Sequence, residues 1–432
     1  MALILWALLL PALALGQAPP NPPSRPVIRA VQVVGVINPV KAGFVTRELA
    51  AANTAGNAAF LIELDTPGGL DSSMREIIQA ILGSRVPVIV YVSPPGARAA
   101  SAGALITLAA DFAAMAPGTN IGAAHPVSIG PGEGGGKVMA EKVLHDAVAY
   151  ARSIAEARGR DPGWAEKMVR ESVSIPASEA LKHKVIDLIA PDRTTLLKEL
   201  DGRPYRRNGR TLALRSAGAE VQSVEMGWSR HLLDAVGNPD VAYLLLMLGM
   251  LGIFFEIASP GAVLPGTVGA IALLLAFFGL QALPVNAIGA LLIAVAFILF
   301  ILEIGIASHG MLTVAGLTAL AFGSLMLIES PAPFLRISRT VIAAVLAVTA
   351  GFIVFVLALV ARAQRSPFRA GREAMAGERG EAVTGVHERG RVFVHGEYWH
   401  AFSKEPIAKG EAVEVVRMAE GLKLEVKRPE KT

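Results

Sequence analysis

A serine lies among small residues in the stretch ARAASAGALITLAAD, residues 97–111. Ser101 follows one apolar run and precedes another, so we expect it at a turn between a strand and a helix. At such a turn the hydroxyl can act as a nucleophile, and the N–H of Ala102 can donate to an oxygen that gains charge. A serine there can also be an N-cap that only satisfies a backbone donor of the helix. By pattern alone, the cap is the simpler interpretation.

A second stretch, LDTPGGLDSSM at residues 64–74, follows another predicted strand. Gly68 and Gly69 leave the backbone bare, so their N–H groups could point at an oxygen that becomes negatively charged during a reaction. Pro-Gly-Gly sequences also form ordinary turns. The motif alone therefore leaves both an oxyanion hole and a plain turn open.

A serine nucleophile needs a neighbouring base that takes its proton. The candidates are His125 in IGAAHPV and Lys137 and Lys142 in GGGKVMAEKVLHDAVAYARS. A lysine serves as a base only where burial or a nearby cation depresses its pKa. Apolar residues such as Val143 on the same predicted helix could turn Lys142 inward. The alternative is a solvated lysine beside Glu141.

The elements that must position these side chains alternate between strands and helices over residues 27–195. Strands are predicted at Val27–Val34, Ala59–Glu63 and Val86–Val92, and helices at Val45–Ala52, Ser72–Leu82 and Lys137–Arg158. This order is typical of a parallel α/β domain. In such domains the loops at the carboxyl ends of the strands usually carry the site.

The composition is typical of a membrane protein. The 432 residues are too many for one typical core, so we expect several domains. Hydrophobic residues make up 53% of the chain and charged residues only 18%. The net charge of +4 does not indicate a nucleic-acid partner, and the absence of Cys excludes disulfides and thiolate catalysis.

Five nearly uncharged runs, each long enough to cross a bilayer, follow residue 240. They are Val241–Ile257, Val263–Leu283, Ala287–Ile306, Met311–Leu327 and Val341–Val360. The first and fourth runs are short, so four spans are the alternative.

The chain ends indicate an orientation across the membrane. An apolar stretch that ends in Ala14-Leu15-Gly16 predicts a secretory signal peptide over residues 1–16, with an uncleaved anchor as the alternative, and residues 17–26 form a Pro-rich linker. After the last run, the positive-inside rule places four arginines in the cytoplasm. They are Arg362, Arg365, Arg369 and Arg372. An exported first domain followed by five spans gives the same orientation.

The apolar region contains a weak internal repeat. The stretch FFEIASPGAVLPGTVGAIALL resembles LEIGIASHGMLTVAGLTAL, and Glu256 and Glu303 lie at matching points of the two copies. Intramembrane carboxylates are functional candidates. The alternative is that both lie at the interface and only cap helix ends.

A last piece, residues 374–428, has the pattern of a small β-barrel. Alternating runs occur at Arg391–Val394, Ala412–Val416 and Lys423–Val426, with glycines between them. Barrels of this kind can bind nucleic acid through basic and aromatic surfaces. Acidic residues balance the basic ones here, so we interpret Tyr398, Trp399 and Phe402 as core residues or protein contacts.

Taken together, these motifs resemble a known family. The segments DTPGGL, RAASAGALITLAAD, MAPGTNIGAAHPV and AVAYARSIAEARGRDPGWAEKMVRES, with GERGEAVTGV in the tail, are similar to the long form of the NfeD family. Its members are membrane-bound serine proteases. The resemblance implies an α/β ClpP/crotonase-like domain, an all-α transmembrane bundle and a small OB-type β-barrel. We place these at residues 27–200, 241–362 and 374–428, with a linker at 201–240.

The resemblance implies a Ser-Lys dyad. The family nucleophile falls on Ser101, and the family lysine, counted back from Arg152, falls on Lys142. Lys137, at the end of a Gly-rich loop, is the second choice. If His125 were the base instead, the dyad assignment would fail.

The same resemblance implies the rest of the site. The oxyanion donors fall on the backbone of Gly68 or Gly69 and of Ala102. We expect Leu70 and His125 to contact the substrate, with no metal and no cofactor.

The family also implies partners, and the chain ends and apolar runs described above give the location. The protein is expected in the cell membrane as a multi-pass homo-oligomer, with the protease domain extracytoplasmic and the barrel cytoplasmic. The resemblance implies that the substrate is an apolar peptide segment of a stomatin-like membrane protein. The competing functions are a non-catalytic membrane scaffold for such a partner and, from the crotonase side, acyl-CoA chemistry. Because CoA is cytosolic, an exported domain argues against the latter.

Overall fold

A computed structural model of the chain describes residues 25–126, 136–207, 209–259, 261, 263–281, 283–306, 308, 310–330, 332–365, 375–419 and 421–429. Its contacts divide the chain into two compact units, Met1–Gly351 and Phe352–Thr432. The predicted signal peptide and most of the Pro-rich linker lie outside the described residues. So do most of the Gly-rich loop and the side chain of Lys137.

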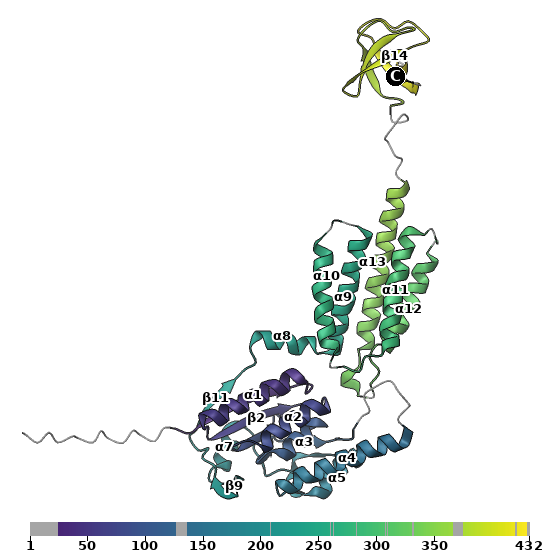
Figure 1. Ribbon diagram of the computed structural model, residues 1–432. Helices are drawn as coiled ribbons and strands as arrows, with labels where there is room; N and C mark the ends of the chain where they lie inside the picture. The colour runs from purple at the N-terminus through teal and green to yellow at the C-terminus, as the bar shows by residue number, and fades with distance from the viewer. Residues whose placement is uncertain are drawn as a thin grey trace, which may run out of the picture. The chain divides into compact units, whose positions relative to one another are not determined.

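The first domain is built on a six-stranded, wholly parallel sheet in the order β11-β1-β2-β3-β5-β8 (Figure 1). The strands are β1 (Val27–Val34), β2 (Ala59–Asp65), β3 (Val88–Val92), β5 (Phe112–Met115), β8 (Leu188–Ile189) and β11 (Glu220–Val224). All five residues of β3 are buried, as expected of a strand that is covered on both faces. The three predicted strands correspond to β1, β2 and β3 and are confirmed.

Helices cover both faces of this sheet and give it two cores. They are α1 (Pro39–Ala55), α2 (Asp71–Leu82), α3 (Ala102–Ala109), α4 (Gly136–Ala157), α5 (Pro162–Arg170), α6 (Ala177–Lys182) and α7 (Arg193–Leu200). The larger core joins one face to α1, α2, α3 and α4, and the smaller core joins the other face to α7. The three predicted helices correspond to parts of α1, to α2 and to α4. The α/β ClpP/crotonase-like fold class is therefore confirmed.

The segment at residues 201–240 is not an irregular linker. It contains a hairpin of β9 (Pro204–Arg207) and β10 (Arg210–Ala213), the edge strand β11 and the helix α8 (Trp228–Val236). β11 pairs in parallel with β1. This edge strand is mostly exposed, so it lacks the apolar run that marked the buried strands.

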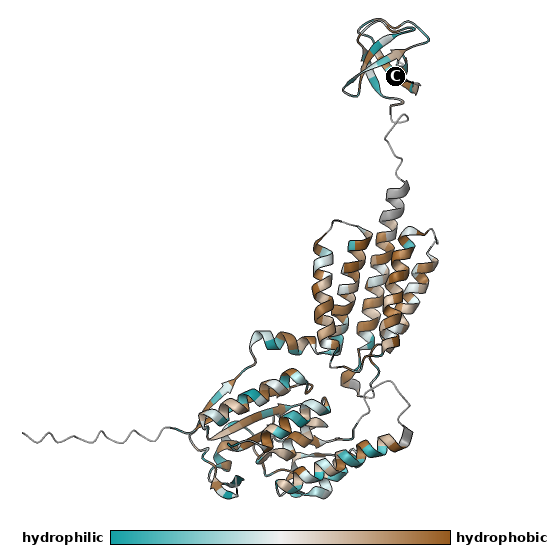
Figure 2. Cartoon of the chain, in the orientation of Figure 1, coloured by the Kyte–Doolittle hydropathy of each residue, from teal (hydrophilic) through white to brown (hydrophobic). Residues whose placement is uncertain are grey.

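Five apolar helices follow, as predicted, and Figure 2 shows that they are hydrophobic along most of their length. They are α9 (Pro239–Ala258), α10 (Leu264–Leu280), α11 (Ala287–Gly305), α12 (Met311–Met326) and α13 (Arg339–Arg365). Within the described ranges, α9, α11 and Arg339–Val356 of α13 are long and apolar enough to cross a membrane, whereas α10 and α12 are shorter. The short helices are thus the second and fourth, rather than the first and fourth.

The internal repeat corresponds to two tightly packed hairpins, α9–α10 and α11–α12. Glycines let the helices of each hairpin approach closely. A Cβ at Gly252 would lie 2.6 Å from the carbonyl oxygen of Pro265, and a Cβ at Gly323 would lie 2.9 Å from that of Gly289. Both copies therefore pack backbone against backbone.

The matching glutamates have different surroundings. Glu303 accepts hydrogen bonds from the Ser308 hydroxyl (2.8 Å) and from the backbone N–H of Gly310 (3.0 Å) and Thr313 (2.8 Å). It therefore caps the start of α12, which is the structural alternative given above. In Glu256, Oε2 is buried and has no hydrogen-bond partner among the described residues.

The second unit contains a closed five-stranded barrel in the order β12-β13-β14-β16-β15. Its strands are β12 (Arg379–Ala382), β13 (Gly390–Val394), β14 (Glu397–Phe402), β15 (Ala412–Ala419) and β16 (Lys423–Lys427). The OB-type barrel is confirmed, although only β13, β15 and β16 were predicted as strands. Trp399 packs against the core, whereas Tyr398 is exposed beside Phe393 with ring centroids 5.0 Å apart.

Candidate active site

Ser101 lies between the short strand β4 (Arg98–Ala100) and α3, in a left-handed backbone conformation with φ 54° and ψ −116°. A side chain in this region costs about 1–3 kcal/mol, and such strain is concentrated at functional sites. The hydroxyl makes no capping hydrogen bond to α3, although Ser101 occupies the N-cap position. The capping interpretation therefore does not hold for this serine. A strained strand–serine–helix turn presents the nucleophile in α/β-hydrolases.

Backbone hydrogen bonds hold this turn from both sides. On one side, β4 pairs with β6 (Asn120–Gly122), and the Ser101 N–H donates to the carbonyl of Gly122 at 2.8 Å. On the other side, the chain beyond β2 runs beside β4. There the Thr66 N–H donates to the Arg98 carbonyl (2.7 Å), and the Ala100 N–H donates to the Thr66 carbonyl (3.1 Å). The serine is therefore fixed by main-chain geometry.

Close packing of the two stretches explains their small residues. A Cβ at Gly68 would lie 2.7 Å from the Ser101 Cβ, and Gly68 has a φ of 122°. A Cβ at Gly103 would lie 2.4 Å from the Thr66 side chain. Larger residues in either stretch would push the glycine turn away from the serine.

The hydrogen bonds separate the oxyanion candidates. The Gly68 N–H donates to the Thr66 hydroxyl at 3.0 Å, so it is already occupied. Among the described residues, the N–H groups of Gly69 and Ala102 have no acceptor. Gly69 and Ala102 also line one cavity with Ser101, whereas Gly68 does not. The geometry thus favours Gly69 over Gly68.

That cavity brings together most of the predicted site residues. It has a volume of about 670 Å³, and its lining includes Ser101, Ala102, Gly69, His125 and Lys142. It runs from the serine between α2 and α4. A peptide segment can occupy a cleft of this size and composition.

Lys142 lies on α4 and lines the cavity, but its side chain is exposed. Within the described part of the chain it has no hydrogen-bond or ion-pair partner. Of the two orientations considered from the sequence, the described chain has the solvated one: Lys142 and Val143 are exposed, whereas Leu144 and Ala147 pack partly against the core and Val148 is buried in it. No hydrogen bond joins Lys142 to Ser101 within those same residues.

His125 also lines the cavity. Its Nδ1 lies 2.9 Å from the carbonyl oxygen of Val169, which can only accept, so Nδ1 is the donor of this bond; in the neutral ring Nε2 then carries the lone pair. This bond fixes the ring against α5. His125 therefore remains a second group that could accept a proton or contact a substrate.

Arg75 on α2 anchors α4 to the wall of the cavity, a role that the sequence did not reveal. It donates to Asp71 (Nε, 2.8 Å) and to Asp146 of α4 (Nη2, 2.7 Å), and it lies 4.3 Å from the ring centroid of Tyr150. Burial by itself lowers the pKa of Arg75, but the hydrogen bonds to Asp146 and Asp71 raise it above its ordinary value. Burial raises the pKa of Tyr150. The clamp holds the helix that carries Lys142.

Leu70, the other predicted substrate contact, lies elsewhere. It lines a separate apolar cavity of about 300 Å³ together with α8 and α10, and it does not line the cavity of Ser101. The glycine turn therefore separates two hollows, one on each side.

Comparisons with known proteins agree with this architecture. Residues 28–197 match the N-terminal domain of NfeD1b, residues 240–359 the NfeD integral membrane domain, and residues 372–428 the NfeD-like C-terminal, partner-binding domain. The chain is 37% identical over 419 residues to the membrane-bound protease PH1510 of Pyrococcus horikoshii. The matched region covers 94% of this chain and 95% of that relative. It is also 30% identical over 304 residues to the membrane protein NfeD1b of Bacillus subtilis, and that match covers 70% of this chain and 67% of the relative.

Solved structures of an archaeal relative are also similar. A lysine-to-alanine variant of a membrane-bound stomatin-specific protease, in complex with a substrate peptide, is 36% identical and covers 49% of this chain and 97% of that one, with a TM-score of 0.45. A serine-to-alanine variant is 35% identical and covers 47% of this chain and all of that one, with a TM-score of 0.44.

The fold and the site define a membrane protein whose ClpP/crotonase-like domain holds a serine on a strained turn above a peptide-sized cavity. The chain belongs to the NfeD family. Its similarity to PH1510 over nearly its whole length supports the function of a membrane protease.

Proposed function

We propose that the chain is a membrane-anchored serine endopeptidase that uses a dyad of Ser101 and Lys142. The neutral Lys142 amine takes the hydroxyl proton, and the Ser101 Oγ forms a bond to the carbonyl carbon of a peptide. The carbonyl oxygen becomes negative and accepts hydrogen bonds from the N–H groups of Gly69 and Ala102.

The tetrahedral intermediate then collapses. The bond between the carbonyl carbon and the peptide nitrogen breaks, and the Lys142 ammonium protonates the leaving amine. Water attacks the acyl group on Ser101, Lys142 accepts a proton from that water, and the peptide acid leaves while the serine regains its hydrogen.

The observation that carries this proposal is the strained Ser101, whose hydroxyl does not cap its helix and borders the cavity that Lys142 also lines. A lysine acts as a base only when it is neutral, and exclusion of water favours the neutral amine. In the single chain Lys142 is exposed. We therefore propose that a bound peptide, or a second copy of the chain in an oligomer, covers the cavity during the reaction.

The proposed substrate is an apolar peptide segment that binds as an added strand. Gly69 pairs with Ile37 on one edge, while its N–H on the other edge has no acceptor in the described chain. An extended peptide can pair with such an open edge. The apolar surface around it would select apolar side chains.

We further propose that a stomatin-like membrane protein is both partner and substrate source. The exposed pair of Phe393 and Tyr398 on the barrel offers an aromatic surface for a protein partner. In the proposed orientation the α/β domain lies outside the cytoplasm and the barrel inside.

The test is cleavage of an apolar peptide by the purified full chain in detergent, followed by mass spectrometry of the products. We expect cleavage by the wild type and none by Ser101→Ala. If both proteins bind the peptide and neither cleaves it, the proposal is wrong and the scaffold function is favoured instead.

A further inference from the structure

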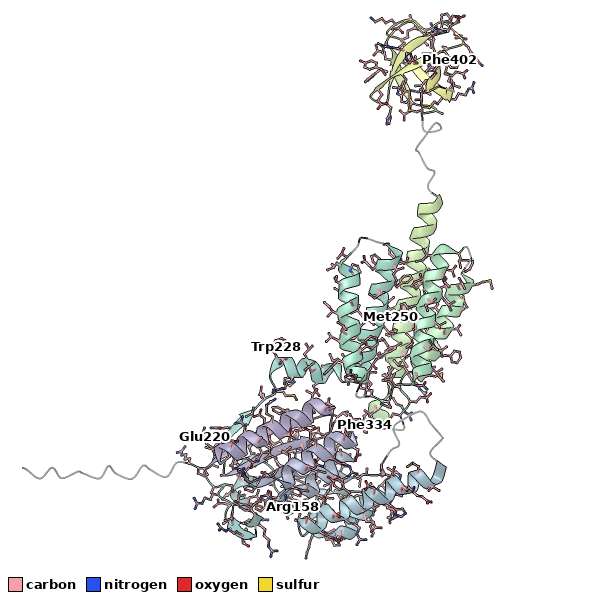
Figure 3. The ribbon with its side chains drawn as sticks, viewed as in Figure 1. Arg158, Glu220, Trp228, Met250, Phe334 and Phe402 are labelled. Atoms are coloured by element: carbon pink, nitrogen blue, oxygen red, sulfur yellow. The ribbon has the colours of Figure 1, made fainter. Side chains whose placement is uncertain are left out.

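One side chain from the membrane domain reaches the candidate active site. Phe334 lies in a short 3₁₀ turn, Pro333–Leu335, between α12 and α13 (Figure 3). A Cβ at Gly68 would lie 3.2 Å from the Ser101 Oγ and 3.3 Å from the ring atom Cζ of Phe334. The serine hydroxyl and the phenyl ring therefore approach the same bare glycine.

The loop that carries Phe334 is held firmly in place. Its neighbours Leu335 and Ile337 are buried, at 2% and 7% exposure. The Ser338 N–H donates to Asp240 of α9 at 2.7 Å, and the Arg336 guanidinium donates to the carbonyl of Ser330. The position of Phe334 is thus set by the loop and by the helical bundle.

The α/β domain is also fixed to the helix that leads into the bundle. Asp234 of α8 forms an ion pair with Lys41 (3.1 Å), whose side chain is only 8% exposed, and accepts a hydrogen bond from Asn38 (2.7 Å). Lys41 and Asn38 lie just after Ile37, the residue that pairs with Gly69. These contacts connect the glycine turn to the membrane domain.

Apolar space adjoins the loop that carries Phe334. Leu335, the next residue, lines the 300 Å³ cavity with Leu70, Leu233, Phe278 and Leu283. On the side of the glycine turn away from Lys142, the surroundings are therefore apolar and come partly from the membrane domain.

We infer that Phe334 is a specificity-determining residue: an apolar substrate side chain close to the reacting carbonyl packs against its ring. The inference rests on the proposed peptidase function. It adds that the membrane domain completes the substrate site, so the isolated α/β domain lacks part of its selectivity.

Peptide binding to the full chain in detergent tests this inference without catalysis. In the Ser101→Ala background, fluorescence anisotropy compares an Ala/Thr host peptide with the same peptide carrying one central Leu. We expect the Leu peptide to bind about tenfold more tightly, as for a side chain that fills an apolar pocket. Phe334→Ala should reduce this preference to less than about threefold, and Phe334→Leu should keep most of it.

Phe322→Ala is the matched control, because Phe322 is an exposed phenylalanine on α12 that lines neither of the two cavities. It should leave the preference unchanged. An unchanged preference in Phe334→Ala overturns the inference. If Phe334→Ala binds both peptides more tightly and to the same extent, the inference is also overturned, because the ring then obstructs the site instead of selecting a side chain.

A second arm separates this inference from the proposed function. With Ser101 intact, a small fluorophosphonate should label wild type and Phe334→Ala at equal rates. Slower labelling of Phe334→Ala indicates a structural role and overturns the inference. If the wild type is not labelled, the proposed peptidase function is wrong. The peptide-binding experiment still tests the role of Phe334 in that case.

Discussion

The two halves of the proposed dyad are held in very different ways. Ser101 is fixed by main-chain hydrogen bonds on both sides and lies in a strained conformation that only this framework can maintain. Lys142 lies on the exposed first half of α4 and has no partner among the residues described. Its nearest support is the clamp that Arg75 makes with Asp146.

This difference indicates which groups of the candidate site are fixed in position before a substrate binds. In the proposed mechanism, the nucleophile and the oxyanion donors are built into the folded backbone, whereas the base reaches its working environment when the cavity is covered. A protease built in this way would gain activity when a peptide or a second copy of the chain covers the cavity. The following variants test that contrast.

The largest effect is expected at the serine. Ser101→Ala should lower turnover of an apolar peptide by about 10⁴-fold or more, because the nucleophile is lost. The fold should persist, since Ala suffers the same strain as Ser at a φ of 54°. Ser101→Gly should be equally inactive but more stable than Ser101→Ala by about 1 kcal/mol, as strain is relieved. Peptide cleavage and thermal unfolding measure these outcomes, and a less stable Gly variant would count against strain at this position.

Removal of the base should have the next largest effect. Lys142→Ala should lower turnover by about 10³-fold without changing the melting temperature, because an exposed side chain contributes little to stability. Lys142→Arg should be as inactive, since a guanidinium stays protonated. Lys137→Ala is the control and should retain activity. If Lys137→Ala or His125→Ala alone abolishes cleavage, the base has been assigned wrongly.

The glycine turn should be intolerant of a single methyl group. In Gly68→Ala the new Cβ would collide with the Ser101 Cβ at 2.7 Å, so we expect at least about a hundredfold loss of activity and a loss of several kcal/mol in unfolding free energy. Gly96 also has a positive φ, 90°, but open space around it. Gly96→Ala should therefore cost only about 1 kcal/mol and leave turnover intact. Equal behaviour of the two variants would contradict the close approach.

The smallest of these effects is expected at the clamp. Arg75→Met should lower kcat by about tenfold, because α4 loses an anchor beside the cavity while Ser101 stays in place. The far-ultraviolet circular dichroism of Arg75→Met should match that of the wild type. Arg152→Met, which removes an exposed ion pair with Glu166 at the far side of α4, is the matched control and should have no effect. If both arginine variants behave alike, Arg75 does not position α4.

Much of the fold could be predicted from the sequence. Buried strands such as β3 and the apolar helices carry strong local patterns. The edge strand β11 does not, because an exposed strand needs no apolar run. Likewise β14 was missed, since its exposed and half-buried residues do not alternate clearly.

The site was predictable only where it is local. Ser101 and the two glycines stand in recognisable short motifs. That Thr66 occupies the Gly68 N–H depends on side-chain geometry that no motif encodes. Phe334 reaches the glycine turn from a distant loop, and such long-range contacts leave no signal in a single sequence.

The most direct test of the dyad is the rate at which a fluorophosphonate labels Ser101 in the full chain, mapped by mass spectrometry, in wild type and in Lys142→Ala. The probe reads the reactivity of the hydroxyl itself and requires no knowledge of the substrate. We predict labelling at Ser101 in the wild type and a rate lower by at least about a hundredfold in Lys142→Ala. Equal rates in the two proteins would contradict the role of Lys142 as the base.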